Sequence, residues 1–296
     1  MTPGVIVVGT DLGPSGACAL DVAVGTASDL GADIQLVCAY AGLPSLDPSL
    51  VGSARQAAES MRGRLEQEHD WRVVALAAEA KRVEASRVSV SSELIEGPPQ
   101  DVLIREAERL SARFIVVGPH THRTSVIDRF FGTTAEHVLA HAPCPVIVAP
   151  LAPHEGGARL RGRGLLVGID GEHQSVEALE VALALGREVG ARVEGVYVGD
   201  DKDAVDRCVD ELRAHAESST HPLEPEALDV VLAGVRQVHE HGDVGRVLIE
   251  AAQRADVGLL VLGTGAPKGI LRVFKPGLVD HVCRESPLPV LVVRAT

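Results

Sequence analysis

The sequence predicts an α/β protein with two doubly wound, mainly parallel sheets of five strands each, fused in tandem and related by a pseudo-twofold axis. Three observations predict this fold. Segments of the first half recur in the same order in the second half, the recurring segments are short aliphatic runs, and helical patterns separate the runs. With 296 residues, each half has the size of an ordinary domain with its own core.

The repeat consists of segments that keep their order and their closing residues. They pair as Val5–Asp11 with Leu165–Asp170, Gly31–Val37 with Gly190–Val196, Val102–Ala107 with Val247–Ala252, Phe114–Gly118 with Leu259–Gly263, and Pro145–Val148 with Pro289–Val292. We predict a first domain at residues 1–150, a linker at 151–163 that contains Pro153 and Gly156, and a second domain at 164–296. The first half is the longer one, mostly within 43–97.

The aliphatic runs are short, rich in Val, Ile and Leu, and apolar without alternation, which is typical of strands buried on both faces of a parallel sheet. Between the runs, apolar residues such as Leu20, Val24 and Ala27 recur at helical spacing. Strand and helix therefore alternate, which favours a doubly wound sheet. The last run of each half is followed by no helix, so we expect it at a sheet edge, paired with its counterpart in the other half.

Composition limits the partners and the compartment. The formal net charge of −13 argues against nucleic acid as the main partner, because phosphate backbones are held chiefly by Lys and Arg. The chain has five cysteines, an odd number, and none of them forms a C-x-x-C pair, which is typical of reduced, buried thiols. There is no signal-peptide pattern, and no apolar stretch approaches the ~20 residues of a membrane helix. We expect a cytoplasmic protein that contacts no membrane.

Ligand-binding residues are expected where parallel strands end, because ligands collect at the carboxyl ends of strands in such sheets. Asp11 and Asp170 close the first strand of each half, and Gly118 and Gly263 close the fourth. The four residues should therefore lie at equivalent edges. Asp11 is equally well interpreted as a turn residue or helix cap before Pro14.

A second candidate lies in the loop after the fourth strand, where Gly132-Thr133-Thr134 precedes a helical pattern. Glycine lets the backbone approach a ligand closely, and the amides of the first helical turn form a natural phosphate site. Thr133 and Glu136 also fit a capping box, in which the hydroxyl caps its own helix without any ligand. Both interpretations stay open.

These motifs resemble the universal stress protein family, once per half and across essentially the whole chain. The family pattern has an aliphatic strand ending in Asp, then G-x-x-G-x9-G-[ST], then a strand led by A-P-C-P-V. Ala142–Val146 reads APCPV, and Ser286–Val290 reads SPLPV as its weaker twin. The resemblance implies a Rossmann-like fold of the adenine nucleotide alpha hydrolase type. It also implies ATP or another adenine nucleotide as ligand, with Mg²⁺ as an optional companion.

The resemblance implies a set of nucleotide-binding residues in each half. In the first half they are Thr10, Asp11, Ala39, Gly118, His122, Arg123, Gly132, Thr133 and Thr134; in the second, as a weaker set, they are Ile169, Asp170, Val198, Gly263 and Gly277. Both loops depart from the pattern. The second glycine is replaced by Thr121 or His122 in the first half and by Ala266 in the second. In the second half Leu278 also replaces the Ser/Thr, and Asp280 would repel phosphate, so the first half is the better equipped.

The function implied is a stress-response module that binds a nucleotide and acts by ligand-linked conformational change and dimerisation, read by an unidentified protein partner. The halves should associate with each other, and the chain with a second copy. The alternative is a dimerising interaction module that binds no nucleotide. We expect no enzyme beyond weak, incidental ATP hydrolysis, because no G-x-S-x-G, P-loop Lys or H-E-x-x-H motif is present.

Histidine pairs offer a third possibility, a metal site. They are His120 with His122, His137 with His141, and His239 with His241, each at a spacing that can chelate. Solvated histidines explain the same pairs, and no nearby Cys or carboxylate pattern completes a tetrahedral set. We therefore assign no metal site.

Overall fold

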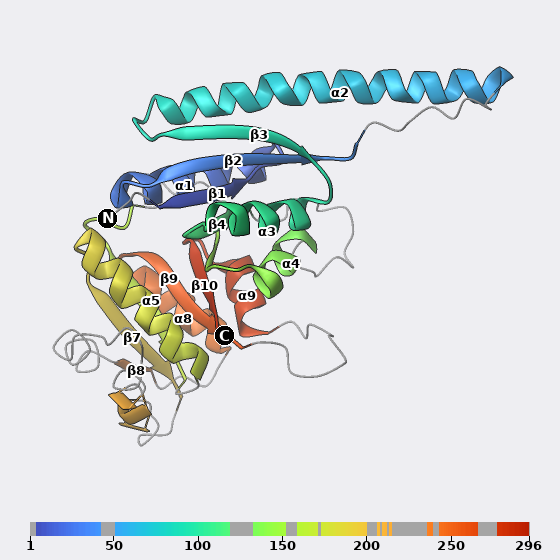
Figure 1. The fold of residues 1–296 in the computed structure, drawn as a ribbon. Helices are drawn as coiled ribbons and strands as arrows, with labels where there is room; N and C mark the ends of the chain where they lie inside the picture. The colour runs from blue at the N-terminus through green and yellow to red at the C-terminus, as the bar shows by residue number, and fades with distance from the viewer. Residues whose placement is uncertain are drawn as a thin grey trace.

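A computed structural model describes most of the chain. The described residues are 4–42, 51–118, 133–151, 159–170, 173–199, 206–207, 209–211, 213–214, 236–238, 243–265 and 277–295. The predicted alternation of strands and helices is confirmed in both halves (Figure 1).

The first half contains five strands and four helices within the described residues. They are β1 (Val5–Gly9), α1 (Pro14–Leu30), β2 (Asp33–Tyr40), α2 (Gly52–Glu84), β3 (Val90–Glu96), α3 (Pro99–Leu110), β4 (Phe114–Val117), α4 (Thr133–His141) and β5 (Val146–Val148). The described elements of the second half are β6 (Gly164–Ile169), α5 (His173–Val189), β7 (Val193–Val198), β8 (Arg236–Val238), α8 (Val244–Arg254), β9 (Val257–Thr264), α9 (Leu278–Glu285) and β10 (Val290–Arg294).

The strands of both halves form one continuous sheet, so the prediction of two separate sheets is wrong. Among the described strands the order is β3-β2-β1-β4-β5-β10-β9-β6-β7-β8. Of the described strand pairs, only β5 and β10 run antiparallel, with Val148 opposite Val290 and Val146 opposite Val292. This confirms that the closing strands of the halves pair. Each would otherwise end its sheet with unpaired backbone groups, and the pairing satisfies both edges at once.

The strand order of the second half is that of the first half in reverse. Such an order, centred on one antiparallel pair, is the arrangement that a twofold axis between β5 and β10 would generate. The sheet twists strongly, so that β1, β2 and β3 run at a steep angle to β9 and β10 in Figure 1.

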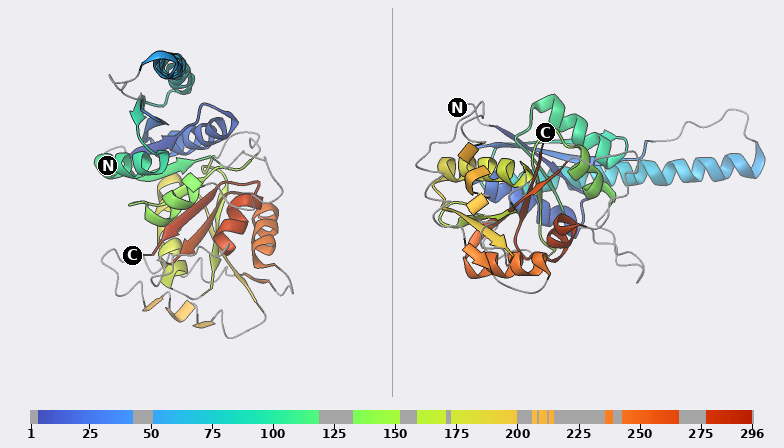
Figure 2. Two further views of the ribbon diagram at one scale, coloured as in Figure 1. Left: turned by 90° about the vertical axis from the view of Figure 1, so that its right-hand side faces the viewer. Right: turned by 90° about the horizontal axis from the view of Figure 1, so that it is seen from below.

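Helices cover both faces of the sheet (Figure 2). Helices α1, α2 and α5 contribute to one hydrophobic core, and α3, α4, α8 and α9 contribute to the other. Along β1, Ile6 and Val8 belong to the first core while Val7 belongs to the second, and all three side chains are fully buried. Since both faces are buried, the strands are apolar without alternation, as the sequence shows.

The end of the linker is fixed to the first half by a buried carboxylate. Asp29, near the end of α1, accepts hydrogen bonds at Oδ2 from the amides of Leu160 (2.6 Å) and Arg161 (2.9 Å). The Leu160 side chain is completely buried in the same core as α1. The halves are therefore joined through the linker as well as through the sheet.

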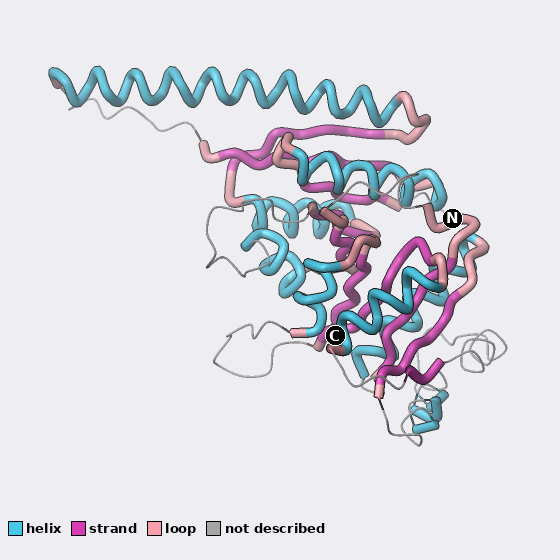
Figure 3. The backbone as a smooth tube through the Cα atoms, turned by 180° about the vertical axis from the view of Figure 1, so that it is seen from behind, coloured by secondary structure: helices cyan, strands magenta, loops and turns pink. Residues whose placement is uncertain are grey.

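Helix α2 accounts for much of the extra length of the first half. Its 33 residues extend about 50 Å at 1.5 Å per residue. Figure 3 shows that it runs beside β3 and continues beyond the carboxyl ends of β2 and β3. Only Leu76 and Val83 of this helix are buried, and both belong to the part that lies over the sheet. Helix α2 therefore reaches the edge of the sheet at which ligands are expected.

Candidate functional site

A cavity of about 310 Å³ lies at the carboxyl ends of β1, β2 and β4. The first turns of α1, α3 and α4 and one residue of α2 complete its wall. Such a position is the expected ligand site of an open parallel sheet.

Five of the residues predicted for the first half line this cavity: Thr10, Asp11, Ala39, Gly118 and Thr134. Thr133 is the first residue of α4, next to the wall, and its side chain lies outside the described part of the chain. His122, Arg123 and Gly132 also lie outside the described residues.

Asp11 holds the start of α1. Its Oδ1 accepts hydrogen bonds from the backbone amides of Gly13 (2.9 Å) and Gly16 (3.0 Å). The bond to Gly13 is the turn role that the sequence allowed, and the bond to Gly16 reaches the first turn of α1, whose N-cap residue is Gly13 itself. The other oxygen, Oδ2, takes no part in these two bonds, so this role and ligand binding are compatible.

Thr10 links β1 to helix α2. Its hydroxyl accepts from the amide of Leu12 (3.0 Å) and donates to Oε2 of Glu79 (3.1 Å). Burial raises the pKa of the Glu79 carboxyl, and the hydroxyl of Thr10 only partly opposes this effect. Leu12 has a positive φ of 60°, a region that non-glycine residues enter mainly where the surroundings enforce it.

Gly118 allows β4 to end directly against α1. A Cβ atom at this position would lie 2.3 Å from the carbonyl oxygen of Ser15, which is far too close. Gly263 has the same relationship to Gln174 in the second half, at 2.0 Å. Both glycines therefore have a packing role at the edge of the cavity, whether or not a ligand is present.

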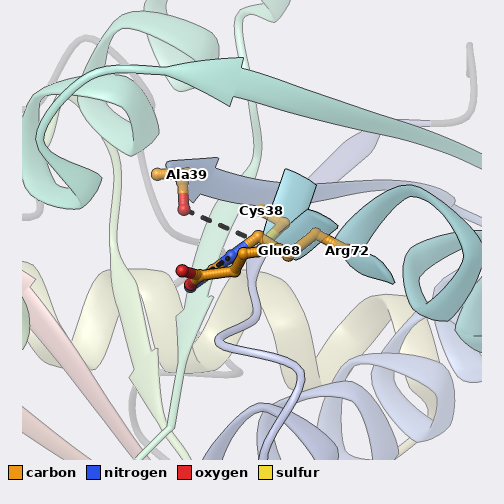
Figure 4. A network of polar contacts seen from close by, with 4 residues as sticks. All are labelled: Cys38, Ala39, Glu68 and Arg72. Carbon is orange, nitrogen blue, oxygen red and sulfur yellow. Dashed lines mark hydrogen bonds and ion pairs between the residues drawn. The ribbon is translucent and has the colours of Figure 1, made fainter. Parts of the chain in front are cut away.

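Among the described wall residues that sequence reasoning missed, Arg72 is the only charged one. Figure 4 shows its side chain reaching from α2 to the end of β2. The guanidinium donates to Oε1 of Glu68 through Nε (3.2 Å) and a terminal nitrogen (2.8 Å), and to Sγ of Cys38 through the other terminal nitrogen (3.6 Å). No local motif marks Arg72, because it comes close to Cys38 only through the path of the long helix.

The second half has a much smaller cavity at the equivalent edge, of about 80 Å³. Ile169, Asp170, Val198 and Gly263 from the predicted set line it, and Gly277 caps the start of α9. Larger side chains occupy the space. Leu278 lines this cavity, and Ile169 occupies the position directly before the aspartate that Thr10 occupies in the first half. Asp280 in the first turn of α9 is buried and paired with Arg284.

Comparison with known proteins identifies the family. The sequence pattern of the universal stress protein family matches residues 4–150 and 163–294, once in each half. The chain belongs to the universal stress protein family. The resemblance noted from the sequence is therefore confirmed, and the tandem arrangement is that of two such domains in one chain.

Similar proteins include full-length tandem structures. A universal stress protein from Archaeoglobus fulgidus DSM 4304 is 18% identical, with 99% of both chains covered and a TM-score of 0.68. A putative universal stress protein from Pseudomonas aeruginosa UCBPP-PA14 is 14% identical, with 99% of this chain and 94% of that chain covered and a TM-score of 0.58. At these identities the likeness shows the fold.

A sequence relative is a universal stress protein of Methanocaldococcus jannaschii, 35% identical over 68 residues. The match spans 23% of the present chain and 39% of the length of that relative.

Among the described residues of this universal stress protein, no three His, Cys, Asp or Glu side chains gather as a metal site would require. His137 and His141 stack with ring centroids 4.3 Å apart, and Nδ1 of His141 lies 2.9 Å from the carbonyl oxygen of His137. The other two histidine pairs fall outside the described residues. No helix in the described part of the chain has the length and apolar character needed to cross a membrane.

Proposed function

We propose that the first half of this universal stress protein binds an adenine nucleotide, and that the second half does not. The observation that supports the proposal is the cavity of about 310 Å³ lined by five of the residues that the family pattern implies. Its volume falls within the range of about 300–1,000 Å³ found for small-molecule sites.

The wall chemistry suits the two ends of a nucleotide. The carboxylate of Asp11 can accept hydrogen bonds from ribose hydroxyls, and the backbone of Ala39 can pair with the edge of the base. The first turn of α4, with Thr134, can receive phosphate, because unpaired amides and the helix dipole favour anions there. Mg²⁺ would accompany the phosphates of ATP. No described residue singles out ATP over AMP or a cyclic nucleotide.

Within the family, a universal stress protein has been solved in complex with cAMP, and one from Arabidopsis thaliana has been solved with AMP bound. These half-length structures have TM-scores of 0.37 and 0.36 against the present chain. The proposal therefore rests on the cavity of this chain.

The role that we propose is regulatory binding without appreciable turnover. The nucleotide would contact the first turns of α1, α3 and α4 together, so it would favour the arrangement in which these helices converge. A partner protein or a second copy would then recognise that arrangement. Brisk steady-state hydrolysis of ATP by the purified chain would contradict this role.

The deciding experiment begins with the chain as purified from cells. The protein is denatured, and the supernatant is analysed for released nucleotide by mass spectrometry. Binding of ATP, AMP and cAMP to ligand-free protein is then measured by calorimetry, with an expected stoichiometry of one nucleotide per chain. Asp11→Ala should abolish binding, whereas the matched substitution Asp170→Ala in the second half should not. Unchanged affinity in Asp11→Ala would remove the site assignment.

A second candidate function is supported by the pairing of the two halves and by the small size of the second cavity. β5 and β10 join the halves without any ligand, so the chain is able to present a fixed surface to a partner in the absence of nucleotide. The same experiment separates the two functions. A chain that releases no nucleotide and binds none by calorimetry would act as a nucleotide-independent interaction module.

A further inference from the structure

Arg72 gives the cavity a charge that the family pattern does not supply. Among the described residues that line it, Arg72 is the only cation and Asp11 the only anion. Its side chain is mostly buried, at 24% exposure, and the carboxylate of Glu68 fixes it from the side of α2. Two hydrogen bonds to one carboxylate oxygen hold the guanidinium in a defined position, so it forms a preorganised part of the wall.

The guanidinium lies at the end of the cavity formed by β2. A terminal nitrogen of Arg72 donates to Sγ of Cys38, and the Cys38 thiol in turn faces the carbonyl oxygen of Ala39 at 3.9 Å (Figure 4). Ala39 is the residue whose backbone would pair with the base. Arg72 is therefore a neighbour of the base rather than of the phosphates, because β2 and β4 flank β1 on opposite sides and α4, which would receive the phosphates, follows β4.

A guanidinium offers hydrogen-bond donors and no acceptor. Three of the five N–H groups of Arg72 donate hydrogen bonds to Glu68 and Cys38. The other two N–H groups take no part in those bonds. Guanine and hypoxanthine carry two adjacent acceptors, O6 and N7, which match an arginine fork. Adenine carries an amino group in place of O6, so its N6 donor would face an N–H donor of the guanidinium and only N7 could accept.

We propose that Arg72 reads the base and that the first-half site accepts 6-oxopurine nucleotides, those of guanine and hypoxanthine, in addition to adenine nucleotides. The inference rests on the proposed function, since it assigns a base-contacting residue to the same cavity. In the second half the described cavity wall contains no cation, and Tyr197 follows Val196 where Cys38 follows Val37. The feature is therefore specific to the first half.

The test compares ATP, GTP and ITP by calorimetry on the full chain and on its Arg72→Met variant. The wild-type chain should bind GTP and ITP at least as tightly as ATP. Loss of a two-bond arginine contact should lower the affinities for GTP and ITP by roughly 5- to 150-fold while leaving that for ATP nearly unchanged. ITP is included because it carries O6 and N7 without the 2-amino group of guanine.

Arg62→Met is the matched control. Arg62 pairs with Glu66 at the same four-residue spacing on α2 and is not part of the cavity wall. This variant should leave the affinities for all three nucleotides unchanged. Arg72→Lys is the second variant, because lysine keeps the charge and loses the fork, so it should also lose the preference for 6-oxopurines. Circular dichroism melts establish that each variant is folded.

The outcomes separate this inference from the function on which it rests. A wild-type chain that binds ATP but neither GTP nor ITP would overturn the role of Arg72 and leave the proposed function standing. An equal loss for all three nucleotides in Arg72→Met, or no loss for any, would also overturn it. A wild-type chain that binds no purine nucleotide would remove both proposals together.

Discussion

Arg113 and Glu188 join the two halves through a two-bond ion pair. One terminal nitrogen of Arg113 donates to Oε1 of Glu188 at 2.8 Å, and the other donates to Oε2. Arg113 precedes β4 and Glu188 lies near the end of α5, so the pair lies at the amino ends of the strands, opposite the candidate site. Both side chains are mostly buried, at 27% and 24% exposure. Such a fork is the geometry in which an ion pair contributes most.

We predict that Glu188→Gln lowers the free energy of unfolding by roughly 0.5–1 kcal/mol at neutral pH. The Arg113 guanidinium lowers the pKa of Glu188 from its ordinary value of 4.5. A carboxyl with a lowered pKa stabilises the fold above its ordinary pKa, and the stabilisation is lost as the pH falls through the lowered value. Urea titrations of wild type and variant should therefore converge below pH 4.5.

Glu59→Gln is the control for this prediction. Glu59 pairs with Arg55 on the exposed surface of α2, where an ion pair contributes about 0.3–0.5 kcal/mol at most. Its effect should be smaller than that of Glu188→Gln. Equal effects of the two substitutions would show that the ion pair between the halves contributes no more to stability than an exposed ion pair on one helix.

The central strands make the two halves one folding unit. Ile147 of β5 lies opposite Leu291 of β10, and both side chains are almost completely buried. We predict that Ile147→Ala lowers the free energy of unfolding by about 2–5 kcal/mol within a single transition, because the cavity is created in a core that both halves share. Val74→Ala, at an exposed position of α2, should change stability by about 0.5 kcal/mol or less. Two separate transitions in calorimetry would contradict the shared core.

Much of the fold was predictable because it is local or repeated. Aliphatic runs without alternation identify buried parallel strands, and the recurrence of Asp11 as Asp170 and of Gly118 as Gly263 fixes which strand ends correspond. These matches also predicted which strand ends form the edge of the cavity. The pairing of the closing strands was also expected, and it is this pairing that joins the two predicted sheets into one.

The contribution of α2 to the site could not be predicted. Glu79 meets Thr10 across 69 positions of sequence, and Arg72 meets Cys38 across 34. Both contacts depend on where a 33-residue helix crosses the sheet, and no motif or spacing encodes that crossing. The size difference between the two cavities also follows from packing, which sequence pattern alone does not measure.

Glu79 gives a pH-dependent test of the wall formed by α2. Burial raises the pKa of Glu79 above its ordinary value of 4.5. The protonated carboxyl therefore stabilises the fold below pH 4.5, and this stabilisation is lost as the pH rises through the raised value. We predict that Glu79→Gln, which resembles the protonated form, raises the melting temperature at pH 7 and has little effect below pH 4.5. A lower melting temperature of the variant at pH 7 would mean that the ionised carboxylate of Glu79 stabilises the fold.

The contrast between Thr134 and Leu278 tests why only one half should bind. Counted from the glycine before each helix, Leu278 corresponds to Thr133, whereas counted back from Pro143 and Pro287 it corresponds to Thr134, nine residues before each proline. Thr134 lines the larger cavity and Leu278 the smaller. We predict that Thr134→Leu lowers ATP affinity at least about tenfold, because it fills the place of the phosphates and removes a hydroxyl. Calorimetry measures the change.

Thr134→Ser and Leu278→Thr complete the comparison. Serine keeps the hydroxyl at position 134, so ATP affinity should stay close to that of the wild type. Leu278→Thr should create no second site, because Ile169 still occupies the position that Thr10 holds in the first half. If Thr134→Leu binds ATP normally, side-chain volume at the start of α4 does not decide binding. The lack of nucleotide binding proposed for the second half would then need another cause, such as the carboxylate of Asp280.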